Sequence, residues 1–207
     1  MTRRRWLEII PGLLTWTTLL ASVLLSIFQP LWMMYFIILF DFYWLLRILY
    51  FTPFTLISWW RYRHALKRDW QAEAEVCVGY TETVHLIFLP TCKEEYPIIR
   101  ATLRTLASTS YPASRMLIVL AGEARDEVRF NGIVAQATQE FAQVFKALWT
   151  TTHPLGLPEE IPGKGSNLHW SGHAILPKVL ELGLDPDRIV VSSLDIDTLV
   201  HPQYFSC

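Results

Sequence analysis

The chain has 207 residues, of which 52% are hydrophobic and 18% are charged. This composition excludes an intrinsically disordered chain and is more apolar than that of a typical soluble domain. Residues 1–75 carry eight Lys/Arg and five Asp/Glu, whereas residues 76–207 carry ten and fourteen, so the second part is acidic and nucleic acid is not an expected partner. Cys77, Cys92 and Cys207 have no CxxC spacing, which argues against a zinc ribbon or disulfide scaffold and fits a reducing compartment.

The first part of the chain has the pattern of a membrane anchor. No charged residue occurs from Ile9 to Phe40, a stretch of 32 residues, whereas about 20 helical residues cross a bilayer core. Gln29-Pro30 interrupts this stretch, and proline disfavours a helix interior. We therefore expect residues 1–60 to form a two-span anchor, with spans at about 9–28 and from Leu31 to about Tyr50 or a little beyond. A cleaved signal peptide is the alternative, but no small-residue cleavage site precedes the next apolar run.

Basic residues flank both ends of this predicted hairpin, which is the pattern of cytoplasmic ends. We therefore expect a multi-pass protein of the cell (inner) membrane whose soluble part faces the cytoplasm, with aromatic residues at headgroup level. The basic residues are Arg3, Arg4, Arg5, Arg61, Arg63, Lys67 and Arg68, and the aromatic ones are Trp59, Trp60 and Tyr62.

Two charged residues fall inside the second predicted span. Asp41 and Arg47 are costly in lipid, which makes them functional candidates. The alternative is that Arg47 extends toward the cytoplasmic headgroups while Asp41 faces protein.

The second part of the chain alternates between short apolar runs and amphipathic stretches, after a juxtamembrane linker or surface helix at 61–83. This alternation predicts an α/β fold, with a mostly parallel sheet and helices on both faces, over residues 84–207. In such sheets, ligands bind outside the carboxyl ends of the strands. The predicted strands are Val84–Thr91, Met116–Ala121, Ala147–Thr152 and Ile189–Leu194, and the predicted helices are 96–109, 126–146 and 166–182, the last interrupted or ended early by Pro177.

Asp195-Ile196-Asp197 directly follows the last predicted strand. Two carboxylates one residue apart at a strand end can converge on one hard cation, Mg²⁺ or Mn²⁺, together with phosphate oxygens. Such a cation offsets the negative charge that develops on a departing diphosphate. The alternative is an acidic turn that caps the next element.

Three further features fall at predicted strand or helix ends. Pro162-Gly163-Lys164-Gly165-Ser166-Asn167 opens a helix, where Lys164 and free backbone N–H groups suit an anion, although Gly165 excludes a Walker A loop. The alternative is a turn capped by Ser166 or Asn167. Glu94 and Glu123 follow the first and second strands and are able to accept hydrogen bonds from a nucleoside; alternatively each is a solvated surface charge.

The histidines suggest a different metal site. His169 and His173 have the spacing of two zinc ligands on one helix face, but Trp170 stands where a zincin motif has Glu. The sequence gives no identifiable partner for His85 or His201.

Five motifs in order carry a resemblance to a known family over roughly residues 84–207. FLPTCKEE, TLASTSYP, LIVLAGEARD, PGKGSNLHW and VVSSLDIDTLVHPQYF together resemble family 2 glycosyltransferases of the GT-A fold, in the membrane-anchored superfamily of cellulose and hyaluronan synthases. The resemblance implies a hexosyltransferase of cell-envelope polysaccharide formation. Its expected partners are a UDP- or GDP-sugar donor, a saccharide or lipid acceptor and the membrane, with Mg²⁺ or Mn²⁺ as cofactor.

The resemblance also implies roles for individual residues. Thr91, Glu94 and Glu123 contact the nucleoside, Lys164 lies near the diphosphate, and Asn167 supports the site. Asp195 and Asp197 hold the metal and the donor diphosphate. Two positions depart from the family pattern: Cys92 stands where an aromatic residue often occurs, and Glu123 replaces the more usual Asp.

The family's general base is a carboxylate well downstream of this acidic motif, and the chain continues only ten residues past Asp197. The base is therefore expected beyond Cys207, in a missing C-terminal region or a second polypeptide, and donor binding is a firmer expectation than turnover. One alternative is a catalytically incomplete, membrane-anchored module that binds a nucleotide or a partner. Another is a haloacid dehalogenase-like phosphatase, in which Asp195 is the nucleophile and Asp197 the acid/base.

Overall fold

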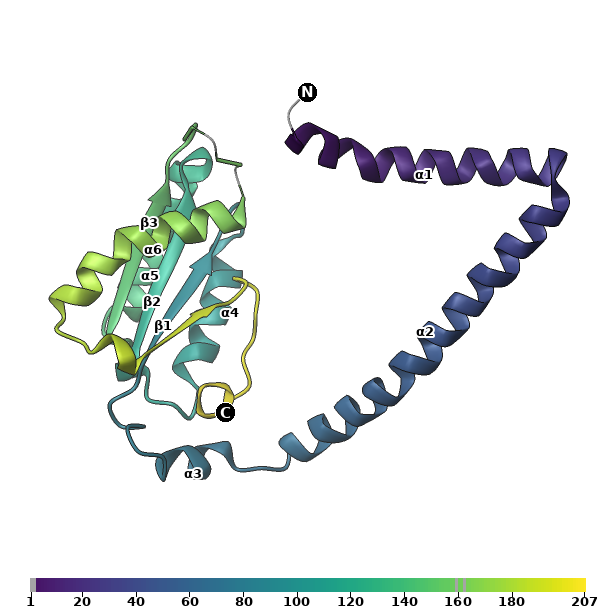
Figure 1. The fold of residues 1–207 in the computed structure, drawn as a ribbon. Helices are drawn as coiled ribbons and strands as arrows, with labels where there is room; N and C mark the ends of the chain where they lie inside the picture. The colour runs from purple at the N-terminus through teal and green to yellow at the C-terminus, as the bar shows by residue number, and fades with distance from the viewer. Residues whose placement is uncertain (1–2, 159, 162) are drawn as a thin grey trace. The chain divides into compact units, whose positions relative to one another are not determined.

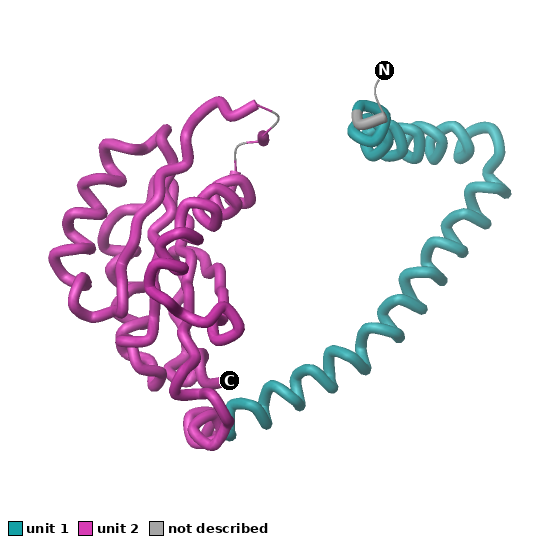
Figure 2. Tube along the Cα trace, turned by 60° about the vertical axis from the view of Figure 1, so that its left-hand side comes forward, with its two compact units in different colours: residues 1–68 teal, residues 69–207 magenta. Residues whose placement is uncertain are grey.

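The computed structural model describes residues 3–158, 160–161 and 163–207, with side chains from residue 5 onward. The chain divides into two compact units, Met1–Arg68 and Asp69–Cys207 (Figure 2). The predicted boundary between the anchor and the rest of the chain, at residue 60, falls inside the last helix of the first unit.

The first unit consists of two long helices, α1 (Arg3–Phe28) and α2 (Pro30–Ala65), separated by Gln29. Pro30 occupies the first turn of α2, where its missing N–H has no helical partner to lose. Both helices are long and apolar enough to cross a membrane. With 36 residues, α2 runs through the predicted second span, from Leu31 to about Tyr50 or a little beyond, and continues to Ala65.

The segment after α2 is tied to the second unit. Asp69 caps the short helix α3 (Trp70–Glu75) by accepting a hydrogen bond from the N–H of Ala72 at 3.3 Å. The backbone N–H of Trp70 donates to Oε1 of Gln203 at 2.9 Å, and Nε2 of Gln203 donates to Oδ1 of Asp69 at 3.0 Å. The part of the predicted linker from residue 69 on therefore packs against the C-terminal segment.

The second unit is built on a parallel four-stranded sheet (Figure 1). Its strands are β1 (Val84–Pro90), β2 (Met116–Glu123), β3 (Ala147–His153) and β4 (Ile189–Ser193), in the order β3-β2-β1-β4. Each neighbouring pair is parallel, so all four carboxyl ends lie at one edge. The continuous apolar runs of β1 and β2 are buried, as expected for parallel strands covered on both faces.

Helices cover both faces of this sheet. Helices α4 (Tyr96–Ala107) and α5 (Glu127–Phe141) pack on one face, and α6 (Lys164–Glu181) packs on the other (Figure 1). The predicted α/β fold class is therefore confirmed, and the architecture is consistent with a GT-A-type fold. On the α4/α5 face the core includes Ile87, Leu89, Ile99, Leu103, Ile118, Phe130 and Ile133; on the α6 face it includes Leu86, Phe88, Leu117, Val119, Ile175 and Val179.

Two helix boundaries differ from the sequence prediction. Helix α6 continues through Pro177 to Glu181, whereas proline was expected to interrupt or end it. Pro177 lies on the exposed side of the helix, as does His173 one turn earlier, so the carbonyl that proline leaves without an N–H partner can be hydrated. Helix α5 ends at Phe141 instead of near residue 146, and turns lead from there into β3.

His85 in β1 is a buried polar side chain, only 7% exposed, in this apolar core. Its ring meets those of Tyr111 and Phe205 edge-on, with centroid separations of 4.6 and 4.9 Å, and its Nδ1 has no hydrogen-bond partner. Burial lowers the pKa of His85 from 6.5 to about 4, partly offset by a hydrogen bond with the backbone of Phe205. The ring is therefore neutral in the folded chain at neutral pH.

This burial makes stability depend on pH in a defined window. Above pH 6.5 the imidazole is neutral in both states; as pH falls toward 4, only the unfolded chain takes up the proton. The free energy of unfolding should therefore fall by about 2–3 kcal/mol across this window. Urea titrations of the full chain in detergent, read by pulse proteolysis of the second unit, measure it.

His85→Phe should remove this pH dependence, because phenylalanine keeps the ring contacts without a titrating group. His173→Gln, at an exposed position on α6, serves as the matched control and should keep the wild-type pH profile. A slope between pH 6.5 and 4.5 that survives in His85→Phe would contradict the assignment.

Candidate functional site

A pocket of about 380 Å³ lies at the carboxyl edge of the sheet. It collects residues from the ends of β1 and β2, the start of α6 and the segment after β4. All seven residues that the sequence analysis selected line this one pocket. The lining residues are Pro90, Thr91, Cys92, Glu94, Glu123, Arg125, Lys164, Asn167, Asp195, Ile196 and Asp197.

The loop after β1 is held by the carboxylate of Glu94. Its Oε2 accepts a hydrogen bond from the hydroxyl of Thr91 at 2.9 Å and from the backbone N–H of Cys92 at 2.6 Å. Lys93 between them has a positive φ of 78°, a conformation that side chains other than glycine adopt only where contacts support it. Both hydrogen bonds use Oε2 of Glu94, so neither occupies Oε1.

Asp126 and Arg129 support the same loop from outside the pocket. Oδ2 of Asp126 accepts a hydrogen bond from the backbone N–H of Lys93 at 3.2 Å. The guanidinium of Arg129 bonds both the Asp126 carboxylate and the carbonyl of Lys93. Hydrogen bonding from Arg129 holds the pKa of Asp126 below its usual value, so this carboxylate remains charged and keeps the loop in place.

A single backbone oxygen joins three elements by bonding two residues that line the pocket, Thr91 and Asn167. The carbonyl of Ala121 in β2 accepts hydrogen bonds from the N–H of Thr91 at 2.9 Å and from Nδ2 of Asn167 at 2.8 Å. Asn167 is 1% exposed, and its Oδ1 accepts from the hydroxyl of Ser171 at 3.3 Å. The Ser171 hydroxyl also lies 2.6 Å from that of Thr151 in β3. Asn167 therefore positions α6 against the sheet with its own polar atoms.

Glu123 ends β2 and is paired with a residue that the sequence analysis did not select. Its side chain is 9% exposed, and its Oε2 lies 2.5 Å from Nε of Arg125. Arg125 lines the pocket and stands two residues past the strand end. The sequence could have indicated Arg125, because it is a basic residue two positions after Glu123, a candidate nucleoside-binding acid.

Asp195 and Asp197 alternate with two buried residues. Leu194 and Ile196 are 9% and 4% exposed and pack into the core, so the intervening carboxylates point outward and line the pocket. The carbonyl of Ile196 accepts a hydrogen bond from the hydroxyl of Thr102 in α4, which anchors the turn. The amino group of Lys164 forms an ion pair with Oδ1 of Asp195.

The donor set fits a hard divalent cation. The exposed carboxylates of Asp195 and Asp197 supply oxygen ligands of the kind that Mg²⁺ and Mn²⁺ prefer. Both cations normally complete their coordination shell with water and phosphate oxygens. Within the described residues, no group of three or more His, Cys, Asp or Glu side chains gathers to hold a metal by itself. Bound ligand would therefore have to contribute to the coordination.

The histidine pair on α6 gathers no additional metal ligand from the part of the chain that the structure describes. His169 and His173 meet ring to ring, with centroids 4.6 Å apart on an exposed face, and no third ligand joins them among the described residues. His201 has a local partner, since its Nδ1 accepts the N–H of Gln203 at 3.3 Å. Pro162, the first residue of the predicted anion loop, lies outside the described residues.

His153 is a second residue that the sequence analysis missed. It ends β3, is 6% exposed, and its Nε2 lies 3.1 Å from Oε2 of Glu160. Together with Glu123 and Arg125 it lines a small cavity of about 60 Å³ next to the main pocket. The sequence could have indicated His153, because it directly follows the predicted strand Ala147–Thr152.

Comparison with known proteins gives little further guidance. No protein-family model and no curated protein sequence matches the chain. One similar solved structure is the mannosyltransferase PcManGT from Pyrobaculum calidifontis in complex with GDP-Man and Mn²⁺, with 18% sequence identity and a TM-score of 0.39. The match covers 73% of this chain and 37% of that one, so the chain spans well under two thirds of that protein's length. At this TM-score the likeness carries no argument about function.

The buried amide of Asn167 provides a direct test of how the pocket is assembled. Asn167→Ala should lower the free energy of unfolding by about 1–3 kcal/mol, because the carbonyl of Ala121 and the hydroxyl of Ser171 lose a partner in a buried site. Urea titration of the full chain in detergent measures this loss. Asn131→Ala, at an exposed position of α5, should change stability by less than about 0.5 kcal/mol. Equal effects of the two substitutions would contradict the structural role of Asn167.

Proposed function

We propose that this chain is the donor-binding part of a membrane-anchored glycosyltransferase. In this proposal it binds a UDP- or GDP-sugar through a divalent cation and serves transfer of the hexose to a hydroxyl of a saccharide or lipid acceptor. The observation that carries the proposal is the convergence of all seven selected residues on one pocket at the carboxyl edge of a parallel sheet. This edge is where open α/β sheets bind their ligands.

The charge of the pocket supports a cation-dependent ligand. Four carboxylates line it (Glu94, Glu123, Asp195 and Asp197) against two cations (Arg125 and Lys164), which leaves a formal net charge of −2. A nucleoside diphosphate alone would meet repulsion there, whereas a divalent cation between the carboxylates and the phosphates would balance the charge. We therefore assign Mg²⁺ or Mn²⁺ to Asp195 and Asp197. Bound there, the cation would neutralise charge on the departing nucleoside diphosphate.

The remaining residues have distinct roles in this proposal. Lys164, which forms an ion pair with Asp195, would contact a diphosphate at the start of α6, where backbone N–H groups also favour an anion. Oε1 of Glu94 and the carboxylate of Glu123 would accept hydrogen bonds from a nucleoside; the two bonds that hold the Glu94 loop use Oε2. Asn167 acts by holding the start of α6 in position.

The membrane part of the proposal rests on α1 and α2. Both helices have the length and hydropathy required for a span. The basic residues at the N-terminal end of α1, and at and just after the C-terminal end of α2, favour a cytoplasmic location for both ends. A cytoplasmic pocket would have access to nucleotide-sugars, and an anchor would keep it beside a membrane-bound acceptor. We assign the chain to the cell (inner) membrane on this basis and propose cell-envelope polysaccharide as the product class.

The edge strand β4 favours a second candidate, a module that binds nucleotide and a partner polypeptide without turnover. Val190 and Val191, which are 46% and 62% exposed, point to opposite faces of this strand. An apolar groove of about 290 Å³ runs beside it, lined in part by Ile175 and Val179 of α6. Parallel strands are usually covered on both faces, so this edge suits a further protein segment. Addition of an acceptor separates the two candidates. A glycosyltransferase then releases nucleoside diphosphate, whereas a module without turnover binds the donor and leaves it intact.

The metal assignment predicts a selective loss of donor binding. Asp195→Ala and Asp197→Ala should each weaken Mn²⁺-dependent binding of the recognised UDP- or GDP-sugar by at least about tenfold, since removing one carboxylate ligand costs more than about 1.4 kcal/mol. Isothermal titration of the full chain in detergent, with Mn²⁺ and each nucleotide-sugar, measures the affinity.

Asp187→Ala is the matched control for this experiment. Asp187 is an exposed aspartate in the turn Pro186–Arg188 just before β4, away from the pocket lining. Its substitution removes the same charge from the chain and should leave donor affinity within about twofold. A wild-type chain that binds no nucleotide-sugar in the presence of Mn²⁺ or Mg²⁺ would overturn the proposed function.

A further inference from the structure

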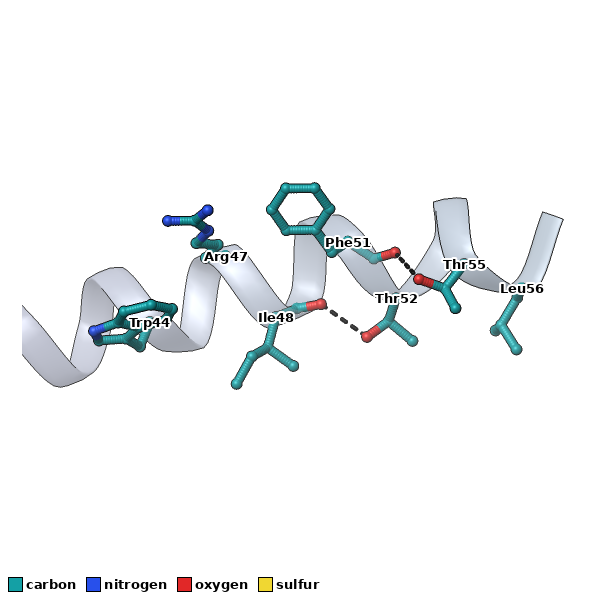
Figure 3. Close-up of a pocket in the computed structure, with 7 residues that line it drawn as sticks. All are labelled: Trp44, Arg47, Ile48, Phe51, Thr52, Thr55 and Leu56. Atoms are coloured by element: carbon teal, nitrogen blue, oxygen red, sulfur yellow. Dashed lines mark hydrogen bonds between the residues drawn. The ribbon is translucent and has the colours of Figure 1, made fainter. Parts of the chain in front are cut away.

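A pocket of about 330 Å³ lies along one face of α2 (Figure 3), separate from the site on the sheet. Arg47 is its one charged residue among those described. Thr52 and Thr55 are polar as well, but their hydroxyls donate to the carbonyls of Ile48 and Phe51, at 2.8 and 3.1 Å. The guanidinium of Arg47 is therefore the main donor that the pocket offers to a ligand. The other lining residues are Trp44, Ile48, Phe51 and Leu56.

The side chain of Arg47 is held by three aromatic neighbours. Its guanidinium carbon lies 5.3 Å from the ring centroid of Trp44 and 5.5 Å from that of Phe51, which are cation–π distances. Its Nη1 donates to the hydroxyl of Tyr43 at 3.0 Å. Within the described part of the chain no carboxylate forms an ion pair with Arg47, so the cation has no counter-ion of its own and most of its N–H groups remain available.

The length of α2 places Arg47 near one surface of a bilayer. Arg47 lies 17 residues after Pro30, a rise of about 26 Å, and the hydrocarbon core is about 30 Å thick. The apolar stretch continues to Trp60, which is 30 residues after Pro30 and corresponds to about 45 Å. This excess over one perpendicular crossing is accommodated, with Arg47 kept near the surface, if α2 bends at Pro53 and continues along the membrane surface.

We propose that Arg47, supported by Tyr43, Trp44 and Phe51, binds the phosphate of an anionic membrane phospholipid. This inference rests on the membrane anchoring proposed above. An arginine at this depth is costly unless it is paired, and a lipid phosphate supplies both the opposite charge and the oxygen acceptors that a guanidinium fork bonds in pairs.

The geometry also favours an anionic over a zwitterionic headgroup. The rings of Trp44 and Phe51 already face the guanidinium, so they do not form a cage for a quaternary ammonium. The other described residues of the pocket include no carboxylate that would hold an ammonium group.

Native mass spectrometry of the full chain, released from mixed vesicles of phosphatidylglycerol and phosphatidylcholine, tests this site. The wild-type chain should retain phosphatidylglycerol over phosphatidylcholine, and Arg47→Gln should reduce that preference by about tenfold, because it removes the charge-assisted hydrogen bonds to the lipid phosphate. Arg63→Gln is the matched control, because Arg63 lies 5.6 Å from the ring of Trp59 on the same helix but outside the pocket. It should keep the wild-type preference.

Three results would overturn the inference: no preference in the wild-type chain, an unchanged preference in Arg47→Gln, or equal losses in Arg47→Gln and Arg63→Gln. The last result would indicate a general attraction of basic residues to an anionic surface. Alkaline carbonate extraction of the same vesicles tests anchoring separately. A wild-type chain that carbonate removes contradicts the anchor as well as the lipid site, whereas retention without lipid preference contradicts the lipid site alone.

Discussion

The pocket depends on one backbone carbonyl at the end of β2. Ala121 accepts hydrogen bonds both from the N–H of Thr91, where β1 ends, and from the side chain of Asn167, one turn into α6. These bonds draw the loop after β1 and the start of α6 toward the same strand end. Because all four strands are parallel, the segment after β4 reaches this edge too. The proximity of Lys164 to Asp195 follows from that arrangement.

Much of the fold could be predicted from the sequence because each strand is a short apolar run and each helix has an apolar stripe. The strands differ from their predicted ranges by at most two residues. The continuation of α6 through Pro177 could not be predicted, because it depends on that face of the helix being exposed. The end of α2 at Ala65 could not be predicted either, since nothing in its apolar pattern marks the end of a helix.

The candidate site could be predicted as a set of residues but not as a set of contacts. The rule that parallel strands end at one edge was sufficient to select Asp195, Glu123 and Glu94 together. The loop after β1 uses one oxygen of Glu94, and Arg125 pairs with one oxygen of Glu123. These contacts depend on side-chain geometry, which leaves no periodic pattern in the sequence. The same limit applies to Arg47: its position in an apolar helix was evident, whereas its support by Tyr43 and two rings was not.

The central claim is that the acidic pocket admits a diphosphate only together with a divalent cation. The most direct measurement is the coupling between the two ligands on the full chain, followed by the electron paramagnetic resonance signal of free Mn²⁺ and corrected for Mn²⁺ held by nucleotide in solution. The account predicts that UDP or GDP tightens Mn²⁺ binding by about tenfold or more, and that Mn²⁺ tightens nucleotide binding by the same factor. Nucleotide binding that is equally strong in the presence of a chelator would contradict it.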